Sequence, residues 1–243
     1  VNGWDVFSMS PPEAERRGDE RVYALPGRSI KGMIRNIYAI ASDSKKDSVD
    51  IARLNPADRL FGWVGNGPNQ ALMGRVSVGF ARFDALETAP SWFKVPYPYG
   101  NWQFVGGAWK KQSGAQAKVD RVADHWRLFP HAPLAPAVET MESFSPDTVA
   151  ASYFRAIMPG ERVRFRIRFW NLEDEELARL LWSVALEPGL AHKIGNHRYL
   201  GFGSLRLTIL PESHLIDWAK RYAGEESDWK IPLSPEKVID PKA

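Results

Sequence analysis

Two segments of the sequence combine glycine with basic residues and have the composition of phosphate-binding sites. The first, residues 25–35 (LPGRSIKGMIR), places Arg28, Ser29 and Lys31 directly after a Pro-Gly turn. Backbone N–H groups at the start of a helix, together with a hydroxyl group and basic side chains, are suited to bind a phosphate oxygen. The same spacing is also typical of a well-capped helix that packs on a sheet, so both interpretations stay open.

The second segment, residues 189–203 (GLAHKIGNHRYLGFG), contains four glycines. Glycine adopts positive φ and allows close backbone approach. The segment has neither the GxGxxG nor the GK[ST] pattern of nucleotide-binding loops. Its chemistry-bearing residues are His192, Lys193, Asn196, His197 and Arg198. A basic, glycine-rich loop of this kind predicts a binding site for a polyanion, and a plain helix–strand connection is the alternative.

A third pattern is an arginine at every second position from Arg162 to Arg168, alternating with apolar residues. This alternation predicts a strand with one apolar face and one arginine face. Four arginines on one face repel one another unless carboxylates or phosphates lie opposite. The pattern therefore indicates either pairing with carboxylates of a neighbouring element or a sheet that faces RNA.

The sequence offers little for catalysis or metal binding. It has no cysteine, and its five histidines form no HExxH or similar ligand spacing. We therefore predict no metal, no cofactor and no assignable catalytic residue, and we interpret Glu173 to Glu176 as a solvated helix start. In a ribonuclease, His197 would be the candidate base for a ribose hydroxyl, although a lone histidine is more often structural.

Composition indicates one folded domain over residues 1–243, with 44% hydrophobic and 25% charged residues. No apolar run approaches the ~18 residues of a membrane span, so we expect no membrane partner. The net charge of +3 is unevenly distributed, because residues 26–83 carry nine basic and four acidic residues. Residues 211–243 are expected to form a helix and an acidic, polar tail.

The hydrophobic pattern predicts strands and helices in a ferredoxin-like α+β order, with residues 84–150 as a long insertion. The insertion is expected to contain short hairpins, such as one around Trp102 to Trp109. The other predicted elements are a strand at 22–25, a helix capped by Ser29 and ending near Ala41, a short helix after Asn55, a strand at 74–83, a hairpin of 153–158 with 162–170, a helix capped by Asn171, a strand within 200–210 and a helix at 215–222.

Three segments together resemble the RAMP superfamily of CRISPR proteins. Residues 25–35 resemble its IPGSSLKGxLR motif, and residues 58–62 (DRLFG) with 74–78 (GRVSV) resemble its LFG…GRVxFSDA motif. Residues 192–207 are similar to its C-terminal glycine-rich loop and last strand. The segment 84–150 carries no matching motif, and it is where the family's thumb hairpin would lie.

The resemblance is to the backbone subunits of type III effector complexes, which bind guide RNA through an RRM-like fold. It implies a cytoplasmic protein whose partners are CRISPR guide RNA, target RNA and other RAMP subunits or domains, with an accessory protein bound through residues 84–150. The RNA-binding residues it implies are Arg28, Ser29, Lys31, Gly32, Arg35, Asn36, Lys193, Asn196, His197, Arg198, Gly201, Phe202 and Gly203.

One departure from the family concerns cleavage. Subunits that cut target RNA carry an aspartate in a glycine-rich loop about a dozen residues before the first motif, and residues 9–20 lack this pattern. We therefore expect a guide-binding unit without its own cleavage site, and the start at Val1 fits one unit of a fused effector. Two alternatives stay open: an endoribonuclease with His197 or His192 as base, and a structural module that binds protein through residues 84–150.

Overall fold

The computed structural model describes residues 4–5, 23–45, 48–96, 102–111, 126, 128–224 and 228–233. The described helices are α1 (Gly27–Ala41), α2 (Pro56–Phe61), α3 (Asp174–Val184) and α4 (Trp218–Tyr222). The described strands are β1 (Trp4–Asp5), β2 (Ala24–Leu25), β3 (Gly62–Val64), β4 (Ala71–Met73), β5 (Val76–Val78), β6 (Ala81–Arg82), β7 (Ser91–Pro96), β8 (Trp102–Val105), β9 (Ala108–Lys111), β10 (Glu139–Met141), β11 (Ala151–Ala156), β12 (Ile167–Phe169), β13 (His192–Lys193), β14 (Ser204–Leu205), β15 (His214–Ile216) and β16 (Lys230–Pro232).

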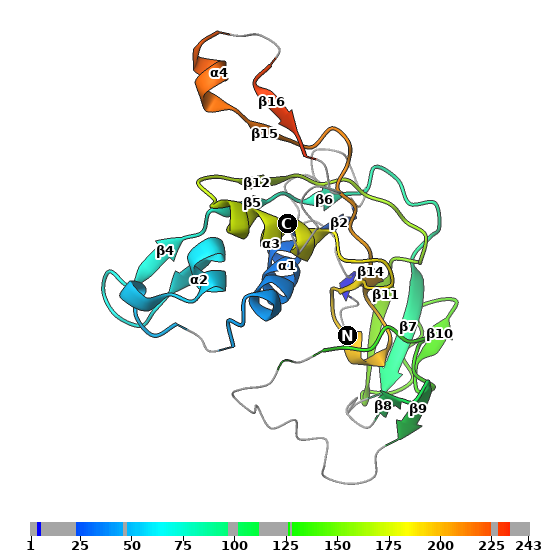
Figure 1. Cartoon of the computed structure of the whole chain (residues 1–243). Helices are drawn as coiled ribbons and strands as arrows, with labels where there is room; N and C mark the ends of the chain where they lie inside the picture. Colours follow the sequence, from blue (N-terminus) through cyan, green and yellow to red (C-terminus); the bar gives the residue numbers. More distant parts are fainter. Residues whose placement is uncertain are drawn as a thin grey trace.

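The first hydrophobic core lies between the two long helices, α1 and α3, and the β5–β12 strand pair (Figure 1). In α1 the buried positions Ile30, Ile34 and Tyr38 recur at the spacing that places side chains on one helix face. They pack with Leu180 of α3, and the apolar side chains of residues 163–169 cover this cluster. The periodicity of the sequence therefore predicted this core correctly.

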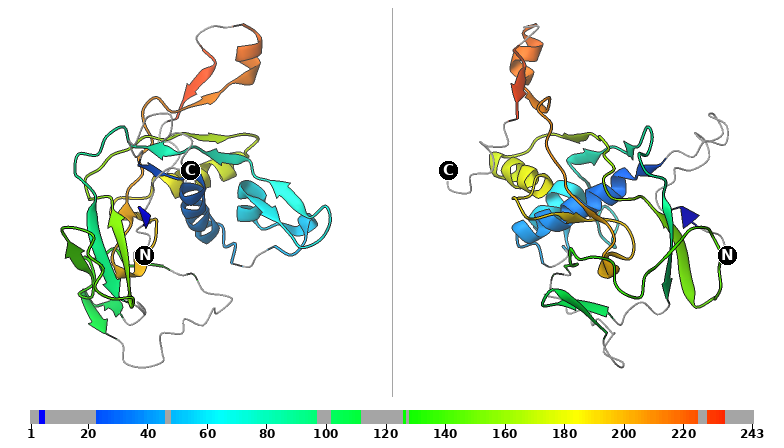
Figure 2. Two further views of the ribbon diagram at one scale, coloured as in Figure 1. Left: turned by 180° about the vertical axis from the view of Figure 1, so that it is seen from behind. Right: turned by 90° about the vertical axis from the view of Figure 1, so that its right-hand side faces the viewer.

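A second core forms around the larger sheet, whose strand order is β1-β11-β7-β10. Phe93 and Val95 of β7 pack with Phe154 of β11 and with Leu200. The predicted hairpin around Trp102 to Trp109 is confirmed as β8 and β9. The two cores are separate in space. Figure 2 shows this from behind, with β7, β10 and β11 on one side of the molecule and α1 to α3 on the other. Part of the segment 84–150 therefore builds a sheet together with residues that follow it.

The predicted hairpin of residues 153–158 with 162–170 is wrong. Strand β11 pairs instead with β7 over all six of its residues, while β12 pairs with β5, with Phe169 opposite Val76. The reason is that the two segments serve different cores. Phe154 belongs to the second core, whereas Phe169 packs against the first, so the Pro159-Gly160 turn connects two layers rather than two paired strands.

Two predicted helix caps are also wrong. Helix α1 begins at Gly27 with Pro26 as its N-cap, so Ser29 lies inside the helix. Gly27 is required there because a Cβ at this position would lie 2.1 Å from the carbonyl oxygen of Val78. In α3 the cap is Glu173, which forms a reciprocal capping box with Glu176.

The predicted strand within residues 200–210 shortens to β14, and the predicted C-terminal helix shortens to α4, which stands with β15 and β16 away from the rest of the molecule (Figures 1 and 2). Most of the described sheets are two-stranded and antiparallel, and four helices occur between their strands in the chain. The α+β class is therefore confirmed in its coarse form.

Candidate functional site

A cavity of about 450 Å³ joins the two glycine-rich segments predicted to bind phosphate. We call it the α1 cavity. One wall is the first half of α1, and the other is the loop after α3, with residues 128–131 at the rim. The predicted site residues that line it are Arg28, Ser29, Gly32, Asn36, Lys193, Asn196 and Arg198. The structure thus brings together residues that are far apart in the sequence.

The α1 wall follows directly from helical geometry. Arg28, Gly32 and Asn36 are each four residues apart, so they share one face of the helix, and all three are exposed. Their face differs from the buried face that carries Ile30 and Ile34. The amide of Ser29 donates to the carbonyl oxygen of Pro26 at 2.9 Å, so this N–H is engaged within the helix start. The side chains, more than the first-turn amides, therefore define this wall.

Lys193 supplies the best-defined positive charge of the cavity. The side chain is largely buried, and its ammonium group donates to the carbonyl oxygens of Gly201 at 3.1 Å and Phe202 at 2.9 Å. Burial, together with the charge of Arg198, lowers the pKa of Lys193 to about 8. An ammonium group has three N–H donors, and two of them are directed at these carbonyls. The hydrogen bonds of the described residues account for no third acceptor.

The charged side chains that line the cavity are basic. None of the described residues that line it is Asp or Glu. The guanidinium of Arg198 lies 4.4 Å from the ring centre of Phe129, so a cation–π contact positions it. Burial and the nearby charge of Lys193 lower the pKa of His131, which leaves this histidine neutral at pH 7. The arrangement is therefore suited to bind an anion.

The histidines considered as catalytic bases lie in different places. His192 lines the cavity but is only 1% exposed, and its Nε2 lies 3.0 Å from the carbonyl oxygen of Val184. Its Nδ1 has no hydrogen-bond partner among the described residues. His197 is stacked on Phe154 with ring centres 4.7 Å apart and is not among the described residues that line the cavity. Burial lowers the pKa of both histidines, so both are neutral at pH 7.

Gly201, Phe202 and Gly203, at the end of the glycine-rich loop, were also predicted to bind RNA, and they contribute to the structure of the loop. Gly203 has φ +77°, and a Cβ there would lie 1.8 Å from the carbonyl oxygen of Ile194. Gly201 has φ +101°, and a Cβ there would lie 2.5 Å from the carbonyl oxygen of Pro133. The ring of Phe202 packs on Phe93 in the second core. None of the three is among the described residues that line the α1 cavity.

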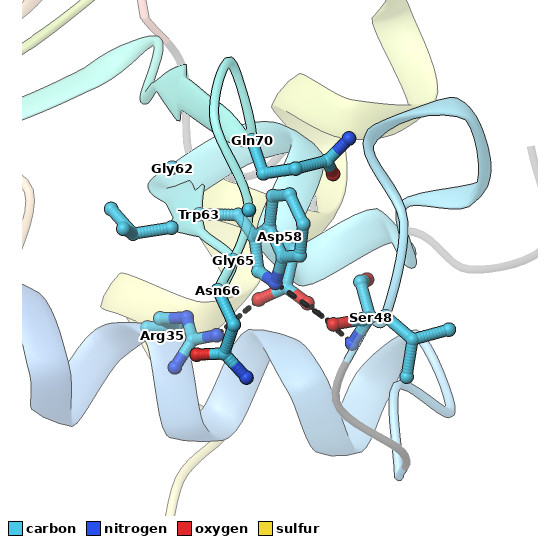
Figure 3. A pocket seen from close by; sticks show the side chains of 11 residues that line it. Arg35, Ser48, Asp58, Gly62, Trp63, Gly65, Asn66 and Gln70 are labelled. Atoms are coloured by element: carbon cyan, nitrogen blue, oxygen red, sulfur yellow. Dashed lines mark hydrogen bonds and ion pairs between the residues drawn. The ribbon is translucent and has the colours of Figure 1, made fainter.

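Arg35 lies in a different cavity, of about 840 Å³, which we call the Asp58 cavity (Figure 3). Its guanidinium forms an ion pair with Asp58, which is 1% exposed. The Asp58 carboxylate also accepts hydrogen bonds from the amide of Ser48 at 3.2 Å and the side chain of Asn55 at 2.8 Å. Burial opposes ionisation of Asp58, but the hydrogen bonds from Ser48 and Arg35 outweigh it and lower the pKa.

Lys31 lines neither of these two cavities in the described part of the chain. Burial and the charge of Arg35 lower the pKa of Lys31. Sequence reasoning in turn missed Phe129 and His131, which come from the segment 84–150. The sequence contains no periodic signal that would place this irregular loop beside α1.

No group of His, Asp or Glu suited to hold a metal occurs among the residues that the structure describes. No described helix has the length and apolar character needed to cross a membrane. No protein-family model matches the chain, and no curated protein matches it either. The α1 cavity holds most of the predicted RNA-binding residues.

Proposed function

We propose that this protein is a guide-RNA-binding module of an RNA-guided effector of the type III CRISPR class, without a cleavage site of its own. The observation that carries the proposal is the α1 cavity, which is lined both by Arg28 of the first RAMP-like motif and by Lys193 and Arg198 of the last. Basic side chains without a carboxylate among them bind phosphate oxygens by charge-assisted hydrogen bonds. The RAMP resemblance supplies RNA as the source of those phosphates.

The glycine at position 32 supports a ligand in this cavity. In a helix interior glycine is about 1 kcal/mol less favourable than alanine. Apart from the backbone of α1 itself, a Cβ at Gly32 would meet no atom of the described residues within 4 Å, so their packing does not require the glycine. The open space beside it belongs to the α1 cavity, where it would let a sugar–phosphate backbone approach the helix closely.

The proposal includes a ferredoxin-like, RRM-like fold for the part that surrounds the first core. The chain order supports it, because α1 follows β2 and α3 follows β12, and both helices pack in the same core. The segment that contains β5 and β6 pairs antiparallel with both β12 and β2. The proposed partners are guide RNA, target RNA and other RAMP subunits or domains in the cytoplasm, with an accessory protein at residues 84–150.

Binding of CRISPR repeat RNA to the full chain, measured over a range of salt concentrations, tests the proposal. We expect Arg28→Ala and Arg198→Ala each to weaken binding about tenfold, because each removes a charge-assisted contact. Each is also expected to lower the salt slope by about 0.7, the value for one phosphate contact on a single strand. Arg53→Ala is the matched control, since Arg53 is exposed and does not line the cavity. Wild-type affinity and slope for Arg28→Ala would refute the assignment.

A nuclease that processes guide RNA is the second candidate, because His192 and His131 both line the cavity. The Nδ1 of His192 has no partner among the described residues, but it is buried, so His192 could act as a base only if its ring became accessible to a ribose hydroxyl. Incubation of the protein with repeat RNA separates the two functions. Cleavage that is lost in His192→Gln and kept in His197→Gln would favour the nuclease, whereas intact RNA would favour binding alone.

A further inference from the structure

The arginines at positions 162, 164, 166 and 168 form an exposed strip on the outer side of the first core. All four side chains are exposed, while the residues between them are half-buried and pack against the core that contains α1 and α3. Trp170 continues the same alternation and is 40% exposed. We call residues 162–170 on this face the arginine strip. None of its residues is among the described residues that line the α1 cavity.

The residues opposite the arginine strip are small and uncharged. Arg168 faces Ser77 across the β5–β12 pair, and Gly79 donates its amide to the carbonyl oxygen of Arg166 at 2.9 Å. Ser77 and Gly79 are both exposed, so the neighbouring strand leaves the strip open. The carboxylates that the alternative interpretation of this pattern requires are therefore absent from the paired strand, as far as its residues are described.

One ion pair involves the strip in the described part of the chain. It joins Arg164 to Glu212 at 3.8 Å, with side chains 83% and 65% exposed. Exposed pairs of this kind contribute little, because water and salt screen them. Among the described residues the like charges of the strip therefore have no effective counter-charge, and they repel one another. A ligand with several negative charges would relieve this repulsion.

The spacing and chemistry of the strip favour the backbone of a single nucleic acid strand. Strand β12 covers only Ile167–Phe169, but the alternating exposure of residues 162–166 continues its two-residue period. At about 6.6 Å for every second residue of an extended chain, the four arginines span about 20 Å. A stacked strand advances ~3.4 Å per phosphate, so this length covers about six nucleotides. The guanidinium group is suited to bidentate phosphate binding, and an exposed tryptophan at the end of the strip can stack on a base. Protein interfaces, by contrast, have an apolar centre, which this strip lacks.

We propose that the arginine strip is a second RNA-binding surface, which binds the phosphates of a single strand through Arg162, Arg164, Arg166 and Arg168 and stacks one base on Trp170. This inference rests on RNA being the ligand of the protein, as proposed above. It adds a surface that is separate from the α1 cavity, so that a longer RNA would contact the protein in two places.

The test compares RNA length and salt dependence in strip and cavity variants of the full chain. The probes are oligouridylates of ~4 to ~16 nucleotides, the range of single-strand sites in small domains. We expect the wild type to bind more tightly and with a steeper salt slope as the oligomer lengthens. The strip variant Arg162→Gln, Arg164→Gln, Arg166→Gln, Arg168→Gln should lose this gain, with the slope for the longest oligomer reduced by up to ~2.8 (four contacts of ~0.7). Arg53→Gln is the matched control.

Two further variants keep the test decisive. If the fourfold variant fails to fold, the double variant Arg164→Gln, Arg166→Gln should lower the slope by about half as much. Trp170→Ala should weaken binding of long oligomers about tenfold, while Trp170→Phe retains an aromatic face and most of the affinity.

The outcomes separate this inference from the proposed function. A strip variant that follows the wild type at every length and salt concentration overturns the strip alone, provided that Arg28→Ala still weakens binding. Loss of long-oligomer binding in the strip variant, with no effect of Arg28→Ala, supports the strip and refutes the cavity. No RNA binding by the wild type refutes both. A strip variant that binds RNA normally but loses binding to polyglutamate would assign the strip to an acidic protein, which also overturns the inference.

Discussion

The two cavities along α1 use their arginines in opposite ways. In the Asp58 cavity, Arg35 forms an ion pair with a carboxylate that also accepts hydrogen bonds from Ser48 and Asn55. In the α1 cavity, Arg28 and Lys193 lie among described lining residues that include no carboxylate. Both arginines belong to the same motif, but Arg35 is paired with a buried carboxylate, whereas no carboxylate lies among the described residues that line the cavity of Arg28. The difference indicates that the groups around an arginine, more than its place in a motif, determine what it can bind.

Replacement of Asp58 by alanine tests the structural half of this comparison and has the largest expected effect. Asp58 is buried although Arg35 is 42% exposed, and removal of its carboxylate costs about 3 kcal/mol because the amide of Ser48 and the side chain of Asn55 lose their acceptor. We expect urea unfolding of Asp58→Ala to show a loss of about that size. The folded fraction should keep wild-type RNA affinity, since Asp58 does not line the α1 cavity.

The matched variant is Arg28→Ala, which changes an exposed side chain and should alter stability by less than ~0.5 kcal/mol. We therefore expect Asp58→Ala to lose stability but not RNA affinity, and Arg28→Ala to lose RNA affinity but not stability. Equal loss of stability in both variants would contradict it, as would a loss of RNA affinity in folded Asp58→Ala.

The second prediction concerns pH and has an intermediate effect. Lys193 has a pKa of about 8, so its ammonium group loses a proton as the pH rises from 7 to 9. If Lys193 binds a phosphate, RNA affinity should fall about tenfold over this interval, equivalent to one charge-assisted hydrogen bond. Fluorescence anisotropy with a labelled RNA at constant ionic strength measures this. Lys193→Gln should bind weakly with no such pH dependence, and an unchanged profile in that variant would assign the titration to another group.

The same pKa shift has the opposite effect on the stability of the protein without RNA. The pKa of Lys193 is lower in the folded state than its ordinary value of 10.5, so the unfolded chain binds more protons between pH 8 and 10.5. Stability rises with pH wherever the unfolded state binds more protons. The contribution of Lys193 to stability should therefore increase from pH 8 to 10.5, so between pH 8 and 9 stability should rise while RNA affinity falls. A fall of both quantities together over that interval would contradict the assignment of the titration to Lys193.

The cavity segments could be predicted from the sequence because their signals are local. A Pro-Gly turn followed by an amphipathic helix, and a loop with four glycines, specify backbone shapes with little help from distant residues. The alternation of residues 162–169 likewise predicted which side chains are exposed. Of the predicted site residues, Arg28, Gly32 and Lys193 line the α1 cavity.

Partners across long distances in the chain could not be predicted in this way. The pairing of β11 with β7 depends on the core in which Phe154 packs. Several apolar segments of the sequence have the pattern of a partner strand for β11, so the pattern alone does not identify β7. Arg35 occupies a position of the first motif at which the resemblance implies RNA binding. The sequence gives no sign that Asp58 lies beside it, because the fold brings the two residues together. The contact of Arg198 with Phe129 comes from an irregular loop without periodicity.

The smallest expected effect, and the most specific one, comes from Gly32→Ala. Beyond the backbone of α1, a Cβ at this position meets no atom of the described residues within 4 Å, so the substitution should raise the stability of the protein by up to ~1 kcal/mol, the helix-propensity difference between glycine and alanine. The same methyl group would project into the α1 cavity, where it separates the helix from a bound backbone, so RNA affinity should fall severalfold. A stability curve from urea unfolding and an RNA titration of one preparation measure both effects. A variant that is more stable and binds RNA as well as the wild type would show that the ligand does not approach α1 at Gly32, because no loss of folding could explain that result.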